Sequence, residues 1–559
     1  RERESKEKVV LNIDIDIVWP PTLPMFSLLN LVLLLVLIQD VQPLQIKIGG
    51  LFTGIEPPTN NGIARLRGAQ LAIKALNNKE AQNTNHTFQL LPLEDKGAGW
   101  HGLRAMCNLT NIGVHSVIGP AYSSTSVTVA KFCSAYHIPC ISYSATSATL
   151  SDRNAYPYFA RVVAPDTMQA SAIAKIVNKF EWKNICILHR DDNYGIQGAL
   201  ATVANAKLNG INVISMKSYN HKTSDAASVA ESLVQDGCRI FIAWCIKCDV
   251  MMKSIYINHP EILTNVENSP PKYAWIMSDG CNGNTGEYSK TNGLGQAVVG
   301  SFCISPSTPD GPTRTSFDNS WHAEYGNLND GVTDTRYALF AYDAVLAATH
   351  SILAEISSTN TNNNNTFELF KLGDNDGDQC LQNPMETQKY WSNGANVLNG
   401  LHNVNFVGAT SGINKLELSQ TNERISAQYS ISNIQGIQLA NTAVDMFTPI
   451  VVGEANVTSN GGAKVAFQRP IQWSSDTTYY ATKPSDVFEI SSRRYKVITF
   501  AGARPFADLV EGKTLCQNCP RYYTNTSMVI YKCPNSCYWG LAFDVMDYLR
   551  SPSNLNFEY

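Results

Sequence analysis

The 559-residue sequence is poor in charged residues and has no excess of positive charge. Charged side chains make up 16% of it, and 43 lysines and arginines against 47 aspartates and glutamates give a formal net charge of −4. Such a chain has no net positive field to attract nucleic acid. Its 44% hydrophobic residues exclude an intrinsically disordered or collagen-like chain. The length predicts roughly three or four globular units.

The sequence also lacks the short motifs of common enzymes. It contains no G-x-S-x-G, G-x-x-x-x-G-K-[ST] or H-E-x-x-H motif, and no G-x-G-x-x-G after a predicted strand. We therefore expect neither catalysis nor a bound cofactor in these residues. The acidic stretch 374–379 resembles part of a calcium loop but lacks the terminal glutamate, which favours a solvated loop over a metal site.

No apolar run in the sequence is long enough to span a bilayer. The charge-free run Phe26–Ile38 has 13 residues, whereas a spanning helix needs about 20. A run of this length shortly after Met25 is typical of a signal-peptide core. We therefore predict a signal peptide over residues 25–45, preceded by a segment, 1–24, that is absent from the mature protein. A retained membrane anchor is the alternative interpretation.

Fourteen cysteines, an even number, favour an oxidising, extracellular compartment. Residues 245–248 and 516–519 are C-x-x-C pairs. Together with Cys533 and Cys537, the second pair makes a four-cysteine group that could also mimic a zinc ribbon. We expect disulfides, because the chain is predicted to be exported. N-x-[ST] triplets agree with export and give candidate N-glycosylation sites at Asn85, Asn108, Asn364, Asn456 and Asn525.

Strand and helix patterns alternate from residue 46, as in a parallel α/β sheet. Strands are predicted at 46–52, 88–95, 116–120 and 140–144, and in a second set at 158–163, 185–189, 239–244 and 273–277. Helices are predicted at 62–78, from Ser123 to His137, from a cap at Asp166 to Lys179, and at 335–358. Two such sets predict two lobes, with a ligand cleft at the carboxyl ends of the strands.

The composition changes in the last quarter of the chain. The α/β pattern extends to about residue 450, and the Ser-, Thr-, Asn- and Gly-rich stretch 451–492 predicts a linker or loop cover. A new strand-to-helix pattern begins at Tyr495 and is still incomplete at residue 559. We therefore expect residues 493–559 to begin a further domain.

Several segments between Val117 and Gly195 resemble a known receptor family. They read VIGPAYSSTSVTVA, IPCISYSATSATLSD, YPYFARVVAPDTMQASAIAKIVNKFEW and DDNYG, and WIMSDG (275–280) and FVGATSG (406–412) follow in the same order. The chain is similar to the ligand-binding region shared by metabotropic glutamate receptors and their class C relatives, natriuretic peptide receptors and the amino-terminal domains of ionotropic glutamate receptors. The resemblance implies a two-lobed type I periplasmic-binding clamshell over residues 46–450.

The same resemblance implies an amino-acid ligand and a set of residues that hold it. Class C members hold the α-carboxylate and the ammonium with residues that match Ser123, Ser144, Thr146, Asp166, Tyr194 and Asp279. Arg65 matches an arginine that pairs with a distal carboxylate, and Trp100 matches a further pocket position. A later lysine of the family has no counterpart here, so an amino acid is implied rather than glutamate in particular. Structural alternatives exist for most of the set: helix caps for Ser123 and Asp166, interlobe packing for Tyr194, a turn for Asp279 and a surface position for Arg65.

The C-terminal segments resemble a different domain. YKVITFAGARPFADL (495–509) and YWGLAFDVMDYL (538–549) are similar to the opening of the type II periplasmic-binding domain of ionotropic glutamate receptors. The leading hypothesis is therefore the extracellular part of an amino-acid-gated channel at the cell membrane, assembled as a homo- or hetero-oligomer through the clamshell. The alternatives are the ectodomain of a class C G-protein-coupled receptor, that of a receptor guanylyl cyclase, and a soluble transport-type binding protein.

Overall fold

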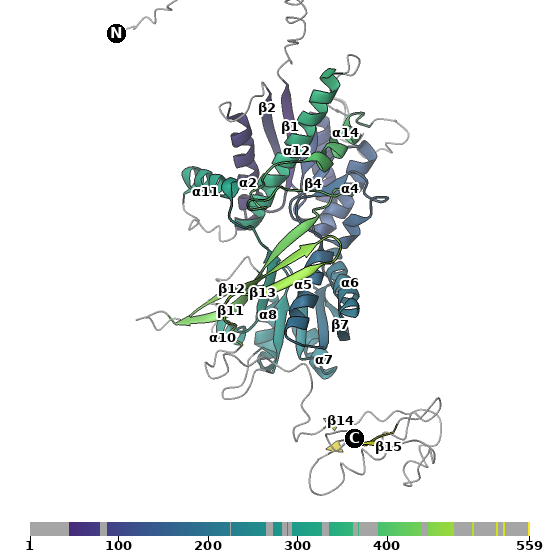
Figure 1. Cartoon of the computed structure of the whole chain (residues 1–559), viewed down its shortest axis with the longest axis vertical. Coiled ribbons are helices and arrows are strands. Elements are labelled where there is room, and N and C mark those ends of the chain that lie inside the picture. The colour runs from purple at the N-terminus through teal and green to yellow at the C-terminus, as the bar shows by residue number, and fades with distance from the viewer. Residues whose placement is uncertain are drawn as a thin grey trace, which may run out of the picture.

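The computed structural model describes residues 44–473 and four short strands beyond them. The gaps within 44–473 are residues 79–85, 224, 264–271, 282–287, 289–292, 327–334, 362–366, 368–389 and 439–444. The strands beyond are β14 (Tyr495–Lys496), β15 (Arg521–Tyr523), β16 (Val529–Tyr531) and β17 (Phe557–Glu558). Within the main part, two β-sheets flanked by helices form two lobes (Figure 1).

Lobe 1 is built on a five-stranded parallel sheet in the order β2-β1-β3-β4-β5. Its strands are β1 (Gln45–Phe52), β2 (Thr87–Glu94), β3 (Ser116–Ile118), β4 (Cys140–Ser142) and β5 (Phe159–Arg161). Its helices are α2 (Asn60–Asn77), α3 (Gly99–Ile112), α4 (Ser123–Tyr136), η1 (Ala148–Ser151), α11 (Pro312–Tyr325), α12 (Arg336–Thr361), α14 (Gly394–Gly400) and η4 (Leu401–Asn403). Every residue of β3, β4 and β5 is buried, as expected for parallel strands covered on both faces.

Lobe 2 is built on an eight-stranded mixed sheet in the order β13-β12-β11-β10-β9-β8-β6-β7. Its parallel part contains β6 (Asn184–Arg190), β7 (Asn212–Tyr219), β8 (Ile240–Trp244), β9 (Ala274–Met277) and β10 (Phe302–Pro306). Antiparallel strands β11 (Ser426–Gln438), β12 (Asp445–Thr458) and β13 (Ala463–Phe467) extend it. Its helices are α5 (Asp166–Lys179), α6 (Asn193–Leu208), α7 (Ala226–Gln235), α8 (Cys248–Asn258), η2 (Pro260–Ile262) and α10 (Leu294–Ala297).

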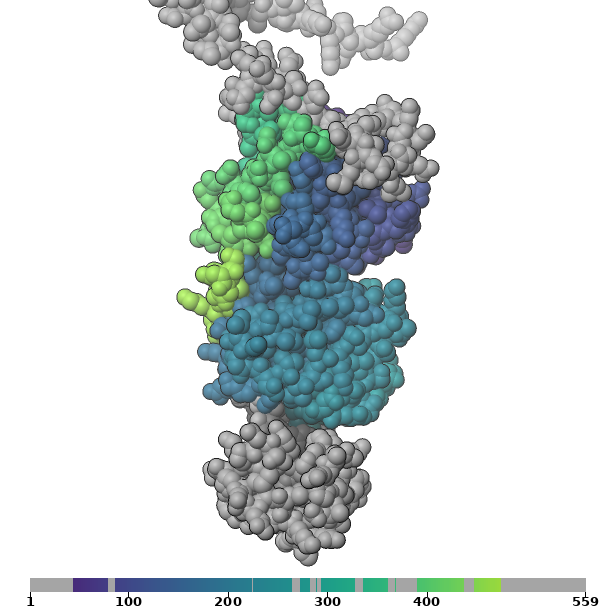
Figure 2. All heavy atoms as spheres, turned by 90° about the vertical axis from the view of Figure 1, so that its right-hand side faces the viewer, coloured from purple at the N-terminus to yellow at the C-terminus, as the bar shows by residue number. Residues whose placement is uncertain are grey.

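Each lobe is assembled from stretches that are not contiguous in the chain. One hydrophobic core contains buried residues of 46–163 and 317–418. Two further clusters, both in lobe 2, contain buried residues of 164–304 and 429–473. The chain therefore passes between the lobes after β5, between β10 and α11, and again before β11. The surface narrows where the lobes meet (Figure 2). Crossings at one junction leave the two lobes free to hinge about it.

The predicted α/β clamshell is confirmed, and most predicted elements lie within two residues of the observed ones. Helix α5 begins at Asp166 and ends at Lys179, as its pattern predicts. The predicted signal peptide and most of the predicted second domain lie outside the described residues. The predicted linker over 451–492 was wrong in its first part, because β12 and β13 add two strands to the lobe 2 sheet.

The missed hairpin has an identifiable turn. Strands β12 and β13 are joined around Asn460 and Gly461, and Gly461 has a positive φ of 82°. An Asn-Gly pair between alternating residues is a strong hairpin signal. The Ser-, Thr- and Gly-rich composition concealed it, since β13 lies at the sheet edge and alternates partly buried with exposed residues.

Helix α12 is the part of the described chain that comes closest to a membrane span. Within residues 336–359, a window of 18 residues has a mean hydropathy of 1.3, but 78% of that window is buried inside the protein. By length and composition this helix is an exception to the expectation that no apolar run of the sequence could span a bilayer. Its packing against α2 and α14 is that of a core helix in a folded domain.

Three disulfides lie in lobe 2, namely Cys186–Cys238, Cys245–Cys248 and Cys281–Cys303. The disulfide interpretation of the first C-x-x-C pair is thus confirmed. The four-cysteine group from Cys516 to Cys537 lies outside the described residues. Within the described part of the chain, no cluster of His, Cys, Asp and Glu side chains could hold a metal ion.

Candidate functional site

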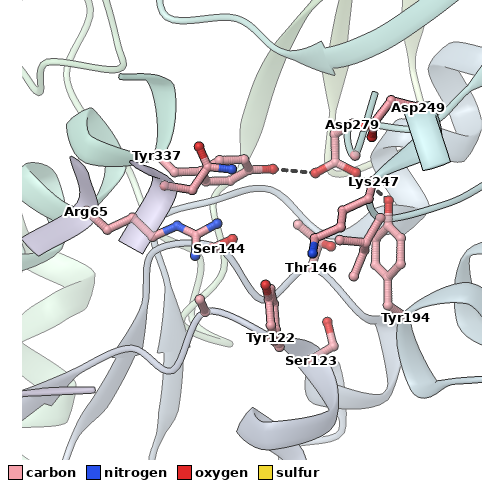
Figure 3. Close-up of a pocket in the computed structure, with 14 residues that line it drawn as sticks. Arg65, Tyr122, Ser123, Ser144, Thr146, Tyr194, Lys247, Asp249, Asp279 and Tyr337 are labelled. Atoms are coloured by element: carbon pink, nitrogen blue, oxygen red, sulfur yellow. Dashed lines mark hydrogen bonds between the residues drawn. The ribbon is translucent and has the colours of Figure 1, made fainter. Parts of the chain in front are cut away.

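A cavity lies at the junction of the lobes, at the carboxyl ends of strands from both sheets (Figure 3). It encloses about 130 Å³ of free space, less than the roughly 300–1,000 Å³ of pockets for drug-sized ligands. Lobe 1 contributes Asn61, Arg65, Ala121, Tyr122, Ser123, Ser144, Thr146 and Tyr337, and lobe 2 contributes Tyr194, Ile246, Lys247, Asp249, Asp279 and Gly280. The size and the polar wall favour a small, polar ligand.

The floor of the lobe 1 wall is the N-terminus of α4. Ser123 is the first residue of this helix, and its hydroxyl accepts a hydrogen bond from the N–H of Ser147 at 3.2 Å. Tyr122, not Ser123, occupies the cap position. The N–H groups of a first helical turn have no partner within the helix and carry partial positive charge. This end of the cavity is therefore suited to a carboxylate.

The loop after β4 forms the neighbouring part of the lobe 1 wall and carries Ser144 and Thr146. The buried hydroxyl of Ser142 accepts hydrogen bonds from the N–H groups of Ser144 at 3.2 Å and Ala145 at 2.9 Å. These bonds fix the loop at the end of the strand, so both predicted residues reach the cavity.

On the opposite wall, Asp279 lies between two tyrosines. The Tyr194 hydroxyl of α6 donates to one carboxylate oxygen, and the Tyr337 hydroxyl of α12 donates to the other. Tyr194 also lies 2.9 Å from the Ser278 hydroxyl and packs against Trp244 with ring centroids 5.7 Å apart. Because Tyr337 belongs to lobe 1, Asp279 links the lobes while presenting a negative charge to the cavity.

Asp166 lies behind this wall rather than on it. It is only 1% exposed, and neither of its carboxyl oxygens has a hydrogen-bond partner among the described residues. Burial, and then the negative charge of Asp279, raise the pKa of Asp166 well above its ordinary value. The predicted capping role of Asp166 was wrong. Pro165 is the N-cap residue of α5, and no side chain caps the described N-terminus of this helix.

Of the two residues predicted for the side-chain end of the ligand, Arg65 lines the cavity and Trp100 does not. Arg65 lines the cavity and is 7% exposed, with its guanidinium carbon 5.7 Å from the centre of the Tyr337 ring. Trp100 is 61% exposed and is not among the described residues that form the wall. Trp100 occupies the second position of α3, where its side chain is left at the surface.

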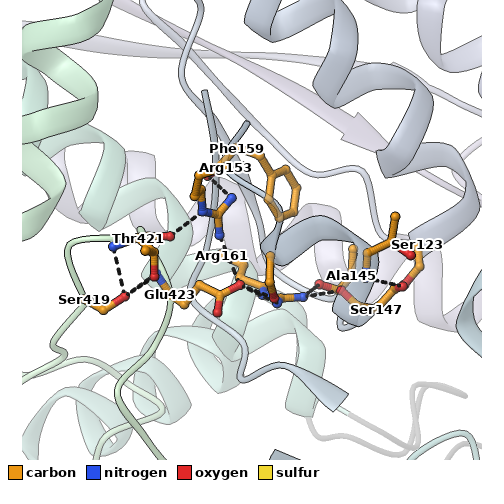
Figure 4. A network of polar contacts seen from close by, with 11 residues as sticks. Ser123, Ala145, Ser147, Arg153, Phe159, Arg161, Ser419, Thr421 and Glu423 are labelled. Atoms are coloured by element: carbon orange, nitrogen blue, oxygen red, sulfur yellow. Dashed lines mark hydrogen bonds and ion pairs between the residues drawn. The ribbon is translucent and has the colours of Figure 1, made fainter. Parts of the chain in front are cut away.

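A buried ion-pair network supports the lobe 1 wall at the hinge (Figure 4). Arg161, at the end of β5, pairs with Glu423 and donates to the carbonyls of Ala145 at 3.3 Å and Ser147 at 2.9 Å. Arg153 also pairs with Glu423, at 3.0 Å. The network thus joins the third crossing of the chain to the loop that carries Ser144 and Thr146.

Sequence reasoning missed several cavity residues, chiefly Lys247, Tyr337 and Asn61. Tyr337 begins a long helix far along the chain, and its apolar neighbours gave no sign that it faces a site. Lys247 lies between the cysteines of the C-x-x-C pair, whose spacing by itself predicts only a disulfide. That pair at the carboxyl end of a predicted strand was the signal that could have found it.

Two of the predicted glycosylation sites lie within the described residues. Asn108 on α3 and Asn456 on β12 are both exposed, so each is accessible to a glycan. Asn85, Asn364 and Asn525 lie outside the described residues. Glycosylation therefore stays a prediction at all of these positions.

Binding of a ligand that carries an ammonium group is expected to release a proton from Asp166. A nearby cation favours the charged carboxylate and so lowers the raised pKa of this group. The affinity for such a ligand should therefore rise with pH, by at most about tenfold per pH unit. This rise is expected between the ordinary pKa of an aspartate and the raised pKa of Asp166 in the unliganded protein. Calorimetric titration in two buffers of different ionisation enthalpy measures the release, and Asp166→Asn should abolish it. Identical proton release by the variant would contradict this role.

Comparison with known proteins agrees with the geometry. The family model described as "Receptor family ligand binding region" matches residues 64–437. Metabotropic glutamate receptor-like protein E of Dictyostelium discoideum is 27% identical over 257 residues, a match that covers 45% of this chain and 30% of that protein. The aligned part of the chain thus spans less than a third of this curated relative's length.

Proposed function

Because the chain belongs to the receptor family ligand-binding region, we propose that it is the extracellular ligand-binding part of a class C, metabotropic-glutamate-like G-protein-coupled receptor that senses an amino acid. The name of the Dictyostelium relative supports this alternative over the ionotropic channel. In this proposal the described residues lie on the extracellular side of the cell membrane. Their role is ligand binding without catalysis. The receptor acts as an oligomer in this proposal.

One observation carries the amino-acid proposal: the two walls of the cavity complement a zwitterion. Lobe 2 presents the Asp279 carboxylate and the Tyr194 ring, which suit an ammonium group. Lobe 1 presents Ser123 and the N-terminus of α4, which suit a carboxylate. An amino acid joins these two groups through one carbon atom, so it would contact both lobes at once.

Contact with both lobes gives the ligand a means of signalling. A ligand shifts a conformational equilibrium only by as much as it favours one state over the other. An amino acid held by lobe 1 alone in an open clamshell gains its contacts to Asp279 and Tyr194 when the clamshell closes. Closure about the hinge is therefore the change that the rest of the receptor would detect.

An ionotropic channel remains the second candidate, because segments 495–509 and 538–549 resemble the start of a channel's ligand-binding domain. In cells that express the complete receptor, the class C proposal predicts a G-protein-dependent response to the amino acid and no ligand-gated current. A current that persists when G proteins are blocked would favour the channel.

Closure should be visible in solution. Small-angle X-ray scattering of the full chain is expected to show a smaller radius of gyration with at least one of the common L-amino acids than without ligand, since the ligand draws lobe 2 toward lobe 1. Circular dichroism establishes that each sample is folded. A folded protein whose scattering is unchanged across the whole panel would contradict the proposed function.

A further inference from the structure

The Tyr337 side chain crosses the cavity from lobe 1 toward lobe 2. Tyr337 is the second residue of α12 and lines the cavity, and its hydroxyl donates a hydrogen bond to the Asp279 carboxylate of the other lobe. In Figure 3 its ring extends from the side of Arg65 toward Asp279. The Arg65 guanidinium carbon lies 5.7 Å from the centre of this ring, a distance at which a cation and an aromatic face attract each other. One aromatic side chain thus reaches from Arg65 to Asp279.

The backbone behind Tyr337 holds the ring in place. Helices α12 and α2 pack against each other, and a Cβ atom at position 68 of α2 would lie 2.1 Å from the Ala338 carbonyl oxygen. Only glycine permits this approach, so α2 closely contacts the residue that follows Tyr337. The ring also packs against Phe340, with ring centroids 6.0 Å apart. Because its backbone is packed and its hydroxyl is bonded, the ring is a fixed part of the cavity wall.

The bond from Tyr337 leaves Asp279 able to bind a ligand. An ionised carboxylate offers about four lone-pair sites on its two oxygens. Tyr194 uses one site on one oxygen, and Tyr337 uses one site on the other. The remaining sites face the ligand's ammonium in the proposed function. The Tyr337 ring therefore lies beside the ammonium and does not replace it.

The position of the two charged groups directs the ligand's side chain toward this ring. In the proposed function the α-carboxylate faces Ser123, and the ammonium faces Asp279 and Tyr194. Figure 3 shows Ser123 at the bottom of the cavity, and Asp279 and Tyr194 on its right. Tyr337 and Arg65 lie on the remaining side of the cavity. A side chain on the ligand's α-carbon therefore extends toward the Tyr337 ring.

The space on that side is short. The whole cavity encloses about 130 Å³ of free space, and the two charged groups of an amino acid occupy part of it. Forcing extra methylene groups into a close-packed site displaces side chains and is destabilising. Displacing the Tyr337 ring would also break its hydrogen bond to Asp279, which is a bond between the lobes.

We infer that Tyr337 is a specificity-determining residue, which limits the ligand to an amino acid with a short side chain. This inference rests on the proposed amino-acid function and adds to it the size of the ligand's side chain. A short ligand leaves the Tyr337 ring and its bond to Asp279 in place as the clamshell closes. A long side chain must displace the ring, so it opposes the closure that a short ligand favours.

The test compares short and long side chains of the same polarity. The full chain is titrated calorimetrically with L-alanine and L-leucine as an apolar pair, and with L-serine and L-glutamine as a polar, uncharged pair. We expect at least one short member to bind about tenfold or more tightly than its long partner. A difference of one methylene group already changes binding in a close-fitting pocket by about 10–200-fold.

Two variants separate the size of the ring from its hydrogen bond. Tyr337→Ala removes the ring and should remove most of the preference, because the long ligand then binds more tightly. Tyr337→Phe keeps the ring and should retain the preference, while both members of a pair bind more weakly because one bond between the lobes is lost. Tyr390→Ala removes an exposed tyrosine outside the cavity wall and should leave all affinities unchanged. Thermal unfolding of each variant establishes that it is folded.

The outcomes separate this inference from the proposed function. If the long ligands bind the wild type as tightly as the short ones, or if Tyr337→Ala keeps the full preference, the role of Tyr337 is overturned and an amino-acid receptor still stands. Loss of the preference in Tyr337→Phe would assign it to the hydroxyl and overturn the role of the ring's size. Absence of binding by every amino acid to the folded chain would overturn the proposed function and this inference with it.

Discussion

Replacing Asp279 with asparagine is expected to weaken amino-acid binding by about 30-fold or more, which corresponds to the 2–5 kcal/mol lost when one partner of a desolvated charge pair is removed. Asparagine keeps the shape of the side chain but carries no charge for the ligand's ammonium. It also disturbs the two tyrosines, because the Tyr194 and Tyr337 hydroxyls each donate to a carboxylate oxygen and one of these becomes an amide nitrogen.

Isothermal titration calorimetry of the wild type and Asp279→Asn with the same amino acid measures this effect. Asp310→Asn is the matched control, because Asp310 is exposed and is not part of the cavity wall. The control should bind as the wild type does. Equal dissociation constants for Asp279→Asn and the wild type would remove this residue from the site and leave the cavity without its ammonium contact.

Glu423→Gln is expected to lower the free energy of unfolding by about 3–5 kcal/mol, the cost of leaving one partner of a buried ion pair without its counterion. The Arg161 side chain is completely buried, and that of Glu423 is 17% exposed. Without the carboxylate, Arg161 and Arg153 would lose the ion-pair partner that they share in the described part of the chain. Arg161 also holds the carbonyls of Ala145 and Ser147, so ligand affinity should fall as well.

Urea denaturation followed by tryptophan fluorescence compares the two proteins, with Glu417→Gln as the control at an exposed site nearby. A change below about 1 kcal/mol, the value typical of exposed ion pairs, would show that the network contributes little. The same measurement has a defined pH dependence. Burial alone would raise the pKa of Glu423, but the charges of Arg161 and Arg153 hold it below its ordinary value.

The sign of that dependence follows from the lowered pKa. The wild-type network contributes its full stability above the ordinary glutamate pKa of about 4.3, and loses it as the pH falls through the lower pKa of the folded state. The difference between the wild type and Glu423→Gln should therefore shrink in acid. A difference that stays constant from neutral pH to below that value would exclude the carboxylate as its source.

The parts of the fold that follow from local pattern were predictable. Buried strands followed by amphipathic helices gave the positions of β1, α2, β6 and α5, because short-range periodicity reports which face is buried. The return of α11, α12 and α14 to lobe 1 was not predictable, since it depends on contacts between residues far apart in sequence. The β12–β13 hairpin was missed because an exposed edge strand has little hydrophobic signal.

The residues of the site also fall into those that the sequence predicts and those that it does not. Ser123, Ser144, Thr146, Tyr194 and Asp279 lie on segments with a recognisable pattern, and the structure brings all of them to one cavity. Asp166 is buried behind that cavity and Trp100 lies at the surface, and both differences depend on side-chain direction, which sequence spacing does not give. The position of Lys247 in the cavity wall depends on the short loop that the Cys245–Cys248 disulfide closes, and its spacing in the sequence does not indicate this position.

The central claim is that the cavity between the lobes binds an amino acid by both of its charged ends. Calorimetric titration of the full chain with the common L-amino acids, each paired with an analogue lacking the α-amino group, tests it most directly. The account predicts that at least one amino acid binds and that its deamino analogue binds about 30-fold or more weakly, since Asp279 then faces no cation. Binding of both members of a pair with equal affinity, or of no amino acid to the folded protein, would contradict it.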